Sequence, residues 1–118
     1  MLQDSQQTQR HQQLAHELER LVSVLKQKYQ PEKIIVYGSY SNNRVKQWSD
    51  LDVAIIKNTP KSFIDRLLEV SRIVDSKVAT DFVVYTPEEF AQMVKDNHFV
   101  RDEIVGKGRL IYDKNKTS

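Results

Sequence analysis

The amino-acid sequence predicts a single α/β domain in which helices cover a small β-sheet. Three observations lead to this prediction. Short apolar runs alternate with segments whose apolar residues recur at helical spacing, the chain has 118 residues, and its composition is 39% hydrophobic and 29% charged. A chain of this length can bury one ordinary core, and alternating strands and helices pack most simply as a layered α/β sandwich.

Four apolar runs are predicted to be strands, because they are rich in Val, Ile, Phe and Tyr and are bounded by turn-forming or charged residues. They are residues 33–37, 50–56, 78–85 and 109–113. The last run, "RLIYD", is expected at an edge of the sheet. The polar tail after it, residues 114–118, is expected to be disordered.

Apolar residues at helical spacing predict helices over about residues 8–29, 61–75, 97–105 and a segment that starts at Pro87. The glutamine-rich start of the first helix is expected to be solvated or frayed, and Pro31 closes that helix. Thr86 is the predicted N-cap of the third helix, with Glu89 completing a capping box. The predicted apolar face of the second helix consists of Phe63, Ile64, Leu67, Leu68 and Val74.

Composition excludes several classes of function. There is no cysteine, which rules out disulfides and thiolate metal sites, and the formal net charge of +2 gives no strong nucleic-acid signal. Apolar runs stop at about four residues, far short of the roughly 20 that cross a bilayer, so no membrane partner is expected. The polar N-terminus has no signal-peptide segment, and we expect cytoplasmic residence.

Two carboxylates stand at the start of the second predicted strand, where a buried strand should be apolar. Strand alternation points Asp50 and Asp52 to the same face, about 7 Å apart, with Leu51 on the other face. Two like charges at about 4 Å and an effective dielectric of about 20 repel by roughly 4 kcal/mol. A hard dication such as Mg²⁺, bound between the two carboxylates, replaces their repulsion with attraction to the ion. Asp81 interrupts the next strand in the same way, so three aspartates predict a two-metal site.

The loop between the first two strands contains residues suited to phosphate. Gly38 and Ser39 directly follow a strand, and "SYSNN" after them suggests the start of a short helix. Free N–H groups at such a turn bind phosphate oxygens, and the serine hydroxyl adds a donor. Arg44 and Lys46, further along the loop, are expected to offset triphosphate charge.

Each of these features also has a purely structural explanation. Gly-Ser after a strand is usually a turn, Asp-x-Asp is usually a strand end or a helix cap, and Asp81 could pair with Lys77. Trp48 is expected to pack at the base of the loop, and Ser49 to hold the loop by capping. The combination of Gly-Ser, Asp-x-Asp ten residues later and a third aspartate in a later strand favours a nucleotide-and-metal site.

The stretch "GSYSNNRVKQWSDLD" resembles the signature of the DNA polymerase beta nucleotidyltransferase superfamily. The similarity covers roughly residues 14–113 of what we take to be one nucleotidyltransferase domain, residues 1–118. It implies a mixed sheet flanked by helices, two Mg²⁺ ions, and transfer of a nucleoside monophosphate from a triphosphate, most simply ATP, to a hydroxyl group. The matching positions are Gly38 and Ser39 for phosphate, Asp50 and Asp52 as metal ligands, and Asp81 as the third carboxylate, which helps to activate the acceptor.

The chain departs from the family pattern in one place. Many members have Ala-Arg-Gly where this chain has Ser41, Asn42 and Asn43. Asn43 can take the left-handed conformation that the glycine would take. The arginine is missing, and Arg44 or Lys46 is the expected substitute.

The short chain, with "DFVVY" and a "GRLIYD" ending, resembles the minimal nucleotidyltransferases that are paired with a small helical HEPN-domain protein. This resemblance implies an antitoxin that transfers AMP from ATP to a tyrosine of a HEPN toxin. Larger relatives have a second domain for the acceptor, so here we expect the acceptor to come from another molecule. Two alternatives remain. One is a non-catalytic antitoxin that binds nucleotide and neutralises its partner by contact, and the other is a small-molecule modifier, similar to aminoglycoside nucleotidyltransferases, that works as a homo-oligomer.

Overall fold

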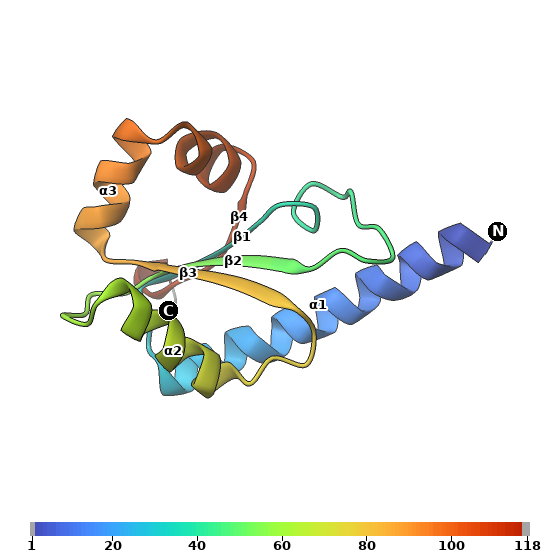
Figure 1. Cartoon of the computed structure of the whole chain (residues 1–118), viewed down its shortest axis with the longest axis horizontal. Coiled ribbons are helices and arrows are strands. Elements are labelled where there is room, and N and C mark those ends of the chain that lie inside the picture. Colours follow the sequence, from blue (N-terminus) through green and yellow to red (C-terminus); the bar gives the residue numbers. More distant parts are fainter. Residues whose placement is uncertain (1, 117–118) are drawn as a thin grey trace.

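The computed structural model describes residues 2–116, and their side chains from residue 6 onward. Helices and strands follow one another along the chain, with a loop between the first two strands, as Figure 1 shows. The elements in chain order are α1 (Leu2–Lys28), β1 (Lys33–Tyr37), β2 (Leu51–Ile56), α2 (Phe63–Val74), β3 (Thr80–Tyr85), α3 (Pro87–Asp96), the π-helix η1 (Val100–Gly106), β4 (Arg109–Asp113) and the 3₁₀ helix η2 (Lys114–Lys116).

The described strands form one mixed sheet in the order β3-β2-β1-β4. β1 is antiparallel to both β2 and β4, whereas β2 and β3 run parallel. The parallel pair needs a crossover, and α2 provides it. The mixed α/β architecture predicted from the sequence is confirmed, as is the edge position of 109–113.

Helices cover both faces of the sheet (Figure 1). α1 and α2 pack on one face, where Leu14, Leu21 and Val70 join a core with Leu51 and other strand residues. α3 and η1 pack on the opposite face, in a smaller core. None of the helices formed by residues 2–116 combines the length and the hydropathy that a membrane span requires.

α1 begins earlier than predicted. It starts at Leu2, where the sequence analysis placed the start near residue 8 and expected a frayed turn. Glutamine is a good helix former, and the helix contacts the rest of the domain from its third turn onward. The Arg10 Nε donates a hydrogen bond of 2.8 Å to the Ser49 carbonyl, and the His11 ring stacks on the Tyr40 ring. The end before Pro31 is confirmed, with Gln30 in the left-handed region.

Other boundaries moved by a few residues. β2 and β3 begin at Leu51 and Thr80, so Asp50 precedes its strand. The segment predicted as a helix over 97–105 is a π-helix that ends at Gly106, as expected. The prediction of a disordered tail is wrong for residues 114–116, which form η2, and residues 117–118 lie outside the described part of the chain.

α2 buries only part of the face predicted for it: Val74 is buried and Leu67 packs against the core. Its buried side chains are Arg66, Val70 and Val74, whereas Phe63, Ile64 and Leu68 are exposed. The cause is Arg66, whose guanidinium donates to the carbonyls of Lys61 and Val84 and to the Glu89 carboxylate. These hydrogen bonds satisfy an arginine beneath the helix, and the helix is rotated accordingly.

Glu89 has two roles at the start of α3. The predicted capping box is confirmed: Thr86 accepts from the Glu89 N–H, and the Glu89 side chain accepts from the Thr86 N–H. The same carboxylate binds Arg66 at 2.7 Å. The cap therefore also ties α3 to α2 across the end of β3.

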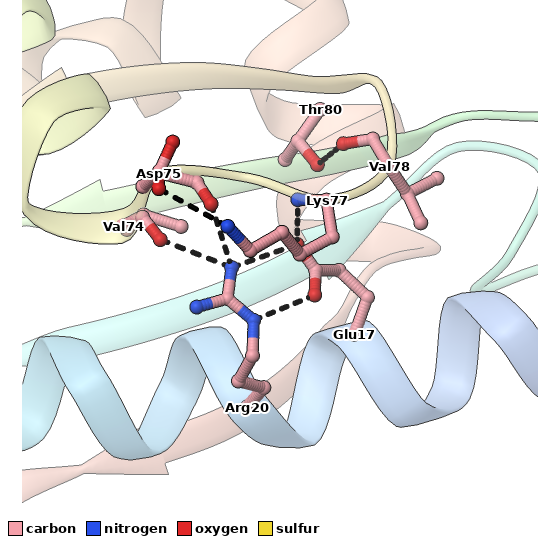
Figure 2. Close-up of polar contacts among 7 residues, drawn as sticks. All are labelled: Glu17, Arg20, Val74, Asp75, Lys77, Val78 and Thr80. Carbon is pink, nitrogen blue, oxygen red and sulfur yellow. Dashed lines mark hydrogen bonds and ion pairs between the residues drawn. The ribbon is translucent and has the colours of Figure 1, made fainter.

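A buried glutamate links α1 to the chain that enters β3. Glu17 is 4% exposed, and its carboxylate accepts from Arg20 at 2.8 and 2.9 Å and from the Lys77 N–H at 2.7 Å. Arg20 also donates to the Val74 and Asp75 carbonyls at the end of α2 (Figure 2). The hydrogen bond from Arg20 lowers the pKa of Glu17 despite its burial.

We predict that Glu17→Ala lowers the free energy of unfolding by about 2–4 kcal/mol, because Arg20 and the Lys77 N–H lose their shared acceptor. Glu19→Ala, an exposed neighbour, is the matched control. Because the pKa of Glu17 is lowered in the folded protein, its stabilisation is present above the ordinary carboxyl pKa of 4.5 and is lost as the pH falls through the folded value. Urea unfolding at several pH values measures both effects. A deficit that does not shrink in acid would contradict this explanation.

Candidate active site

Three side chains stand in one row across the sheet. Asp52 of β2 lies in register with Asp81 of β3 on one side and with Tyr37 of β1 on the other. Residues directly opposite one another on neighbouring strands share a face of the sheet. Ala54 and Val83, two residues further along, belong to the core beneath α3 and η1, so the row lies on that face.

The two carboxyl groups of the row interact. Burial raises the pKa of Asp52 to about 6, and repulsion by Asp81 and Asp50 and a hydrogen bond shared with Asp81 act in the same direction. Tyr37 is affected as well: burial raises its pKa to about 12, with contributions from Asp52, Tyr85 and Asp81. No lysine or arginine of residues 2–116 forms an ion pair with Asp52 or Asp81. The pair therefore repels without a compensating cation from the described chain.

Gly38 allows Asp52 to take its position. Its φ is +79°, a conformation that favours glycine, and a Cβ added there would collide with Asp52 Oδ2. The carboxylate thus packs directly against the backbone at the end of β1. Both the turn and the carboxylate position require a residue without a side chain here.

Asp50 lies apart from the other two aspartates. It precedes β2, is exposed, and its Oδ1 is 3.6 Å from Arg10 Nη2. It is near enough to raise the pKa of Asp52. Within residues 2–116, no three acidic or histidine side chains are gathered into a group ready to hold a metal ion. Asp50 would have to leave Arg10 to join Asp52 and Asp81, so the three-carboxylate site remains a prediction.

The loop after Gly38 is a tight turn rather than the short helix suggested by the sequence. The Asn42 N–H donates to the Gly38 carbonyl and the Arg44 N–H to the Ser39 carbonyl. Asn43, at φ +56°, takes the left-handed conformation predicted for it, which ends the turn. The N–H groups of Ser39, Tyr40 and Ser41 donate no hydrogen bond to any described residue, and they are free to bind an anion.

The basic residues of the loop are available to a ligand. Arg44 and Lys46 are exposed, and neither forms an ion pair with residues 2–116. The prediction that Trp48 packs at the base of the loop is wrong, because its side chain is 67% exposed. Ser49 holds the loop instead: its Oγ accepts from the Lys46 N–H at 2.8 Å, which confirms the predicted capping role.

Residues far away in the sequence fix this loop. Tyr40, which is buried, lies between the His11 ring of α1 at 5.0 Å and the Arg109 guanidinium of β4 at 5.3 Å. Arg10 holds the Ser49 carbonyl. Sequence reasoning missed Arg10, His11 and Arg109, because nothing in their local pattern relates them to residues 38–50.

An aromatic contact lies at the Tyr37 end of the row. The Phe99 ring, 53% exposed, packs edge-on against Tyr37 at 5.9 Å. The sequence analysis missed Phe99 altogether. Strand alternation could have placed Tyr37, because residues 35 and 37 of β1 share a face, but it could not have paired Tyr37 with Phe99 from another layer.

Fold and geometry together define a class of protein. A mixed α/β domain that presents two repelling carboxylates beside a glycine turn with free N–H groups is suited to bind a dication and phosphate. A family model described as "Polymerase beta, Nucleotidyltransferase" matches residues 19–117. The chain belongs to this nucleotidyltransferase family.

A solved structure supports the fold. A proposed nucleotidyltransferase from Sulfolobus solfataricus aligns with a TM-score of 0.68 at 16% sequence identity, covering 94% of this chain and 90% of that one. At this identity the likeness concerns the fold alone. The search of curated proteins gave no match.

We predict that Asp52→Asn stabilises the protein at neutral pH by about 1–2 kcal/mol. This is less than the whole pKa shift of Asp52 would give at roughly 1.4 kcal/mol per pKa unit, because the carboxyl is partly exposed to water. A carboxyl whose pKa is raised from 3.8 to about 6 binds its proton more tightly in the folded state. Wild-type stability should therefore fall as the pH rises from about 4 to 6. Asp102→Asn, an exposed aspartate on η1, is the control. Equal pH profiles for wild type and Asp52→Asn in chemical unfolding would contradict the assignment.

Proposed function

We propose that the protein transfers a nucleoside monophosphate to a hydroxyl acceptor at Asp52 and Asp81, most simply AMP from ATP: the hydroxyl oxygen bonds to the α-phosphorus and pyrophosphate leaves. The observation that carries the proposal is the in-register pair of carboxylates against Gly38, in a chain of the polymerase beta nucleotidyltransferase family. Such a transfer asks little covalent chemistry of the protein and depends on positioning and on charge neutralisation.

The donor set fits a hard dication. Asp52 and Asp81 offer carboxylate oxygens that repel one another and have no partner cation in the described chain. Asp52, Asp81 and, once it leaves Arg10, Asp50 would hold Mg²⁺, as two ions in the arrangement implied by the family. When bound, Mg²⁺ neutralises charge on the triphosphate and polarises the phosphate under attack.

The remaining residues bind and orient the nucleotide. The free N–H groups of Ser39 to Ser41 and the Ser39 hydroxyl bind triphosphate oxygens, and Gly38 allows close approach. Arg44 and Lys46 supply positive charge from the exposed side of the loop. Asp81, exposed at the start of β3, accepts the proton of the incoming hydroxyl.

The acceptor we propose is a tyrosine of a HEPN-domain toxin, with this protein acting as the antitoxin. Two of the three carboxylates, Asp50 and Asp81, are exposed. An open arrangement suits a bulky acceptor that itself excludes water from the reacting groups when it docks. The HEPN partner rests on the resemblance of the sequence to minimal nucleotidyltransferases.

We predict that Asp81→Asn reduces AMP transfer at least about 100-fold, because the hydroxyl loses its proton acceptor and the dication a ligand. The assay follows ³²P from α-labelled ATP and Mg²⁺ to a co-expressed HEPN protein. Asp102→Asn is the control and should retain wild-type transfer. Undiminished transfer by Asp81→Asn would refute the proposed site.

The same assay separates the alternatives. Neutralisation of the toxin by Asp81→Asn without transfer would favour a non-catalytic antitoxin. Label on a small hydroxyl compound in the absence of any partner protein would favour a small-molecule modifier. Either result leaves membership of the family unchanged.

A further inference from the structure

The outward face of α2 is apolar at its centre. Ile64 is 61% exposed and Leu68 48% exposed, and they lie one turn apart. A surface helix normally presents polar residues on this side, opposite the buried Arg66, Val70 and Val74. These two side chains are among the five that the sequence analysis assigned to the apolar face of this helix.

Two charged side chains beside this apolar pair have no ion-pair partner among the described residues. Asp65 and Arg72 are exposed on the same side of α2, and neither forms an ion pair with a described residue. Other charged groups around α2 are paired, Lys61 with Glu69 at 2.6 Å and Arg66 with Glu89 at 2.7 Å. The unpaired charges are therefore confined to the rim of the apolar pair.

The spacing of these four residues is self-complementary. Ile64 lies four residues before Leu68, and Arg72 lies four residues after it. If two α2 helices run antiparallel about a twofold axis at Leu68, Arg72 of each helix lies across from Ile64 and Asp65 of the other. The aliphatic part of each arginine then covers an isoleucine, while its guanidinium reaches an aspartate.

We infer that the exposed face of α2, formed by Ile64, Asp65, Leu68 and Arg72, binds the same face of a second copy of this chain. A highly acidic or basic partner is not favoured, because the face has one unpaired charge of each sign at positions that exchange under twofold symmetry. The face lies on the side of the sheet opposite Asp52 and Asp81, so both candidate active sites stay open in the pair.

The dimer formed through α2 is expected to be weak. α2 has 12 residues and at about 1.5 Å per residue is about 18 Å long, so its contact is smaller than the roughly 1,200 Å² of a standard stable interface. Dissociation in the micromolar range and a marked dependence on concentration follow.

Sedimentation equilibrium of the full chain, from about 1 to 500 μM, tests the inference over the range in which such interfaces dissociate. Wild type should show a monomer–dimer equilibrium. Leu68→Glu should weaken it at least about tenfold, because two like charges then meet at the axis. Leu110→Glu, at an equally exposed leucine on β4, is the matched control and should leave it unchanged. Circular dichroism verifies that each variant is folded.

Charge reversal makes the test specific. Asp65→Arg alone and Arg72→Asp alone should each weaken the dimer about tenfold, and the double variant should restore it, because both pairs re-form with reversed sign. A monomer at every concentration would overturn the inference. So would a dimer that Leu68→Glu leaves intact, a dimer lost with Leu110→Glu, or a double variant no better than the single ones.

Discussion

The contact on which the rest of the site depends is that of the Asp52 carboxylate with the Gly38 backbone, beside Asp81. Burial in this position raises the pKa of Asp52, and the neighbouring carboxylate of Asp81 repels it. In a stable protein such an arrangement is unfavourable unless something binds it, and strongly perturbed carboxyls of this kind gather at functional sites. The fold supports the contact from both sides, since the glycine directly follows β1 and β3 supplies the second carboxylate.

Much of the remaining structure holds these three strand ends in place. Glu17 and Arg20 of α1 secure the chain that enters β3 (Figure 2), while Arg10 and His11 of the same helix contact the loop between β1 and β2. α1 therefore packs on the face opposite the carboxylates and contacts the segments that lead into β2 and β3. Arg10 and His11, in the third turn of α1, contact Ser49 and Tyr40, and Tyr40 is part of the candidate phosphate-binding turn.

The sequence predicted the architecture well because each strand and helix is marked by local periodicity and local caps, as in the box of Thr86 and Glu89. It also predicted the left-handed Asn43 and, from strand pattern, the joint position of Asp52 and Asp81 on neighbouring strands. Prediction from the sequence failed where a residue far away in the chain determines the local structure. Arg66 lies beneath α2 and leaves Ile64 and Leu68 of the predicted apolar face exposed. Asp50 faces Arg10, which strand alternation alone cannot reveal.

The account rests on the claim that Asp52 and Asp81 together bind a divalent cation with the nucleotide. Binding of Mn²⁺, measured by electron paramagnetic resonance in the presence of a non-hydrolysable ATP analogue, tests it without any acceptor. Wild-type protein should bind Mn²⁺, and Asp52→Asn should bind it at least about tenfold more weakly, since a carboxylate ligand becomes an amide. Equal affinity in the two proteins would contradict the account.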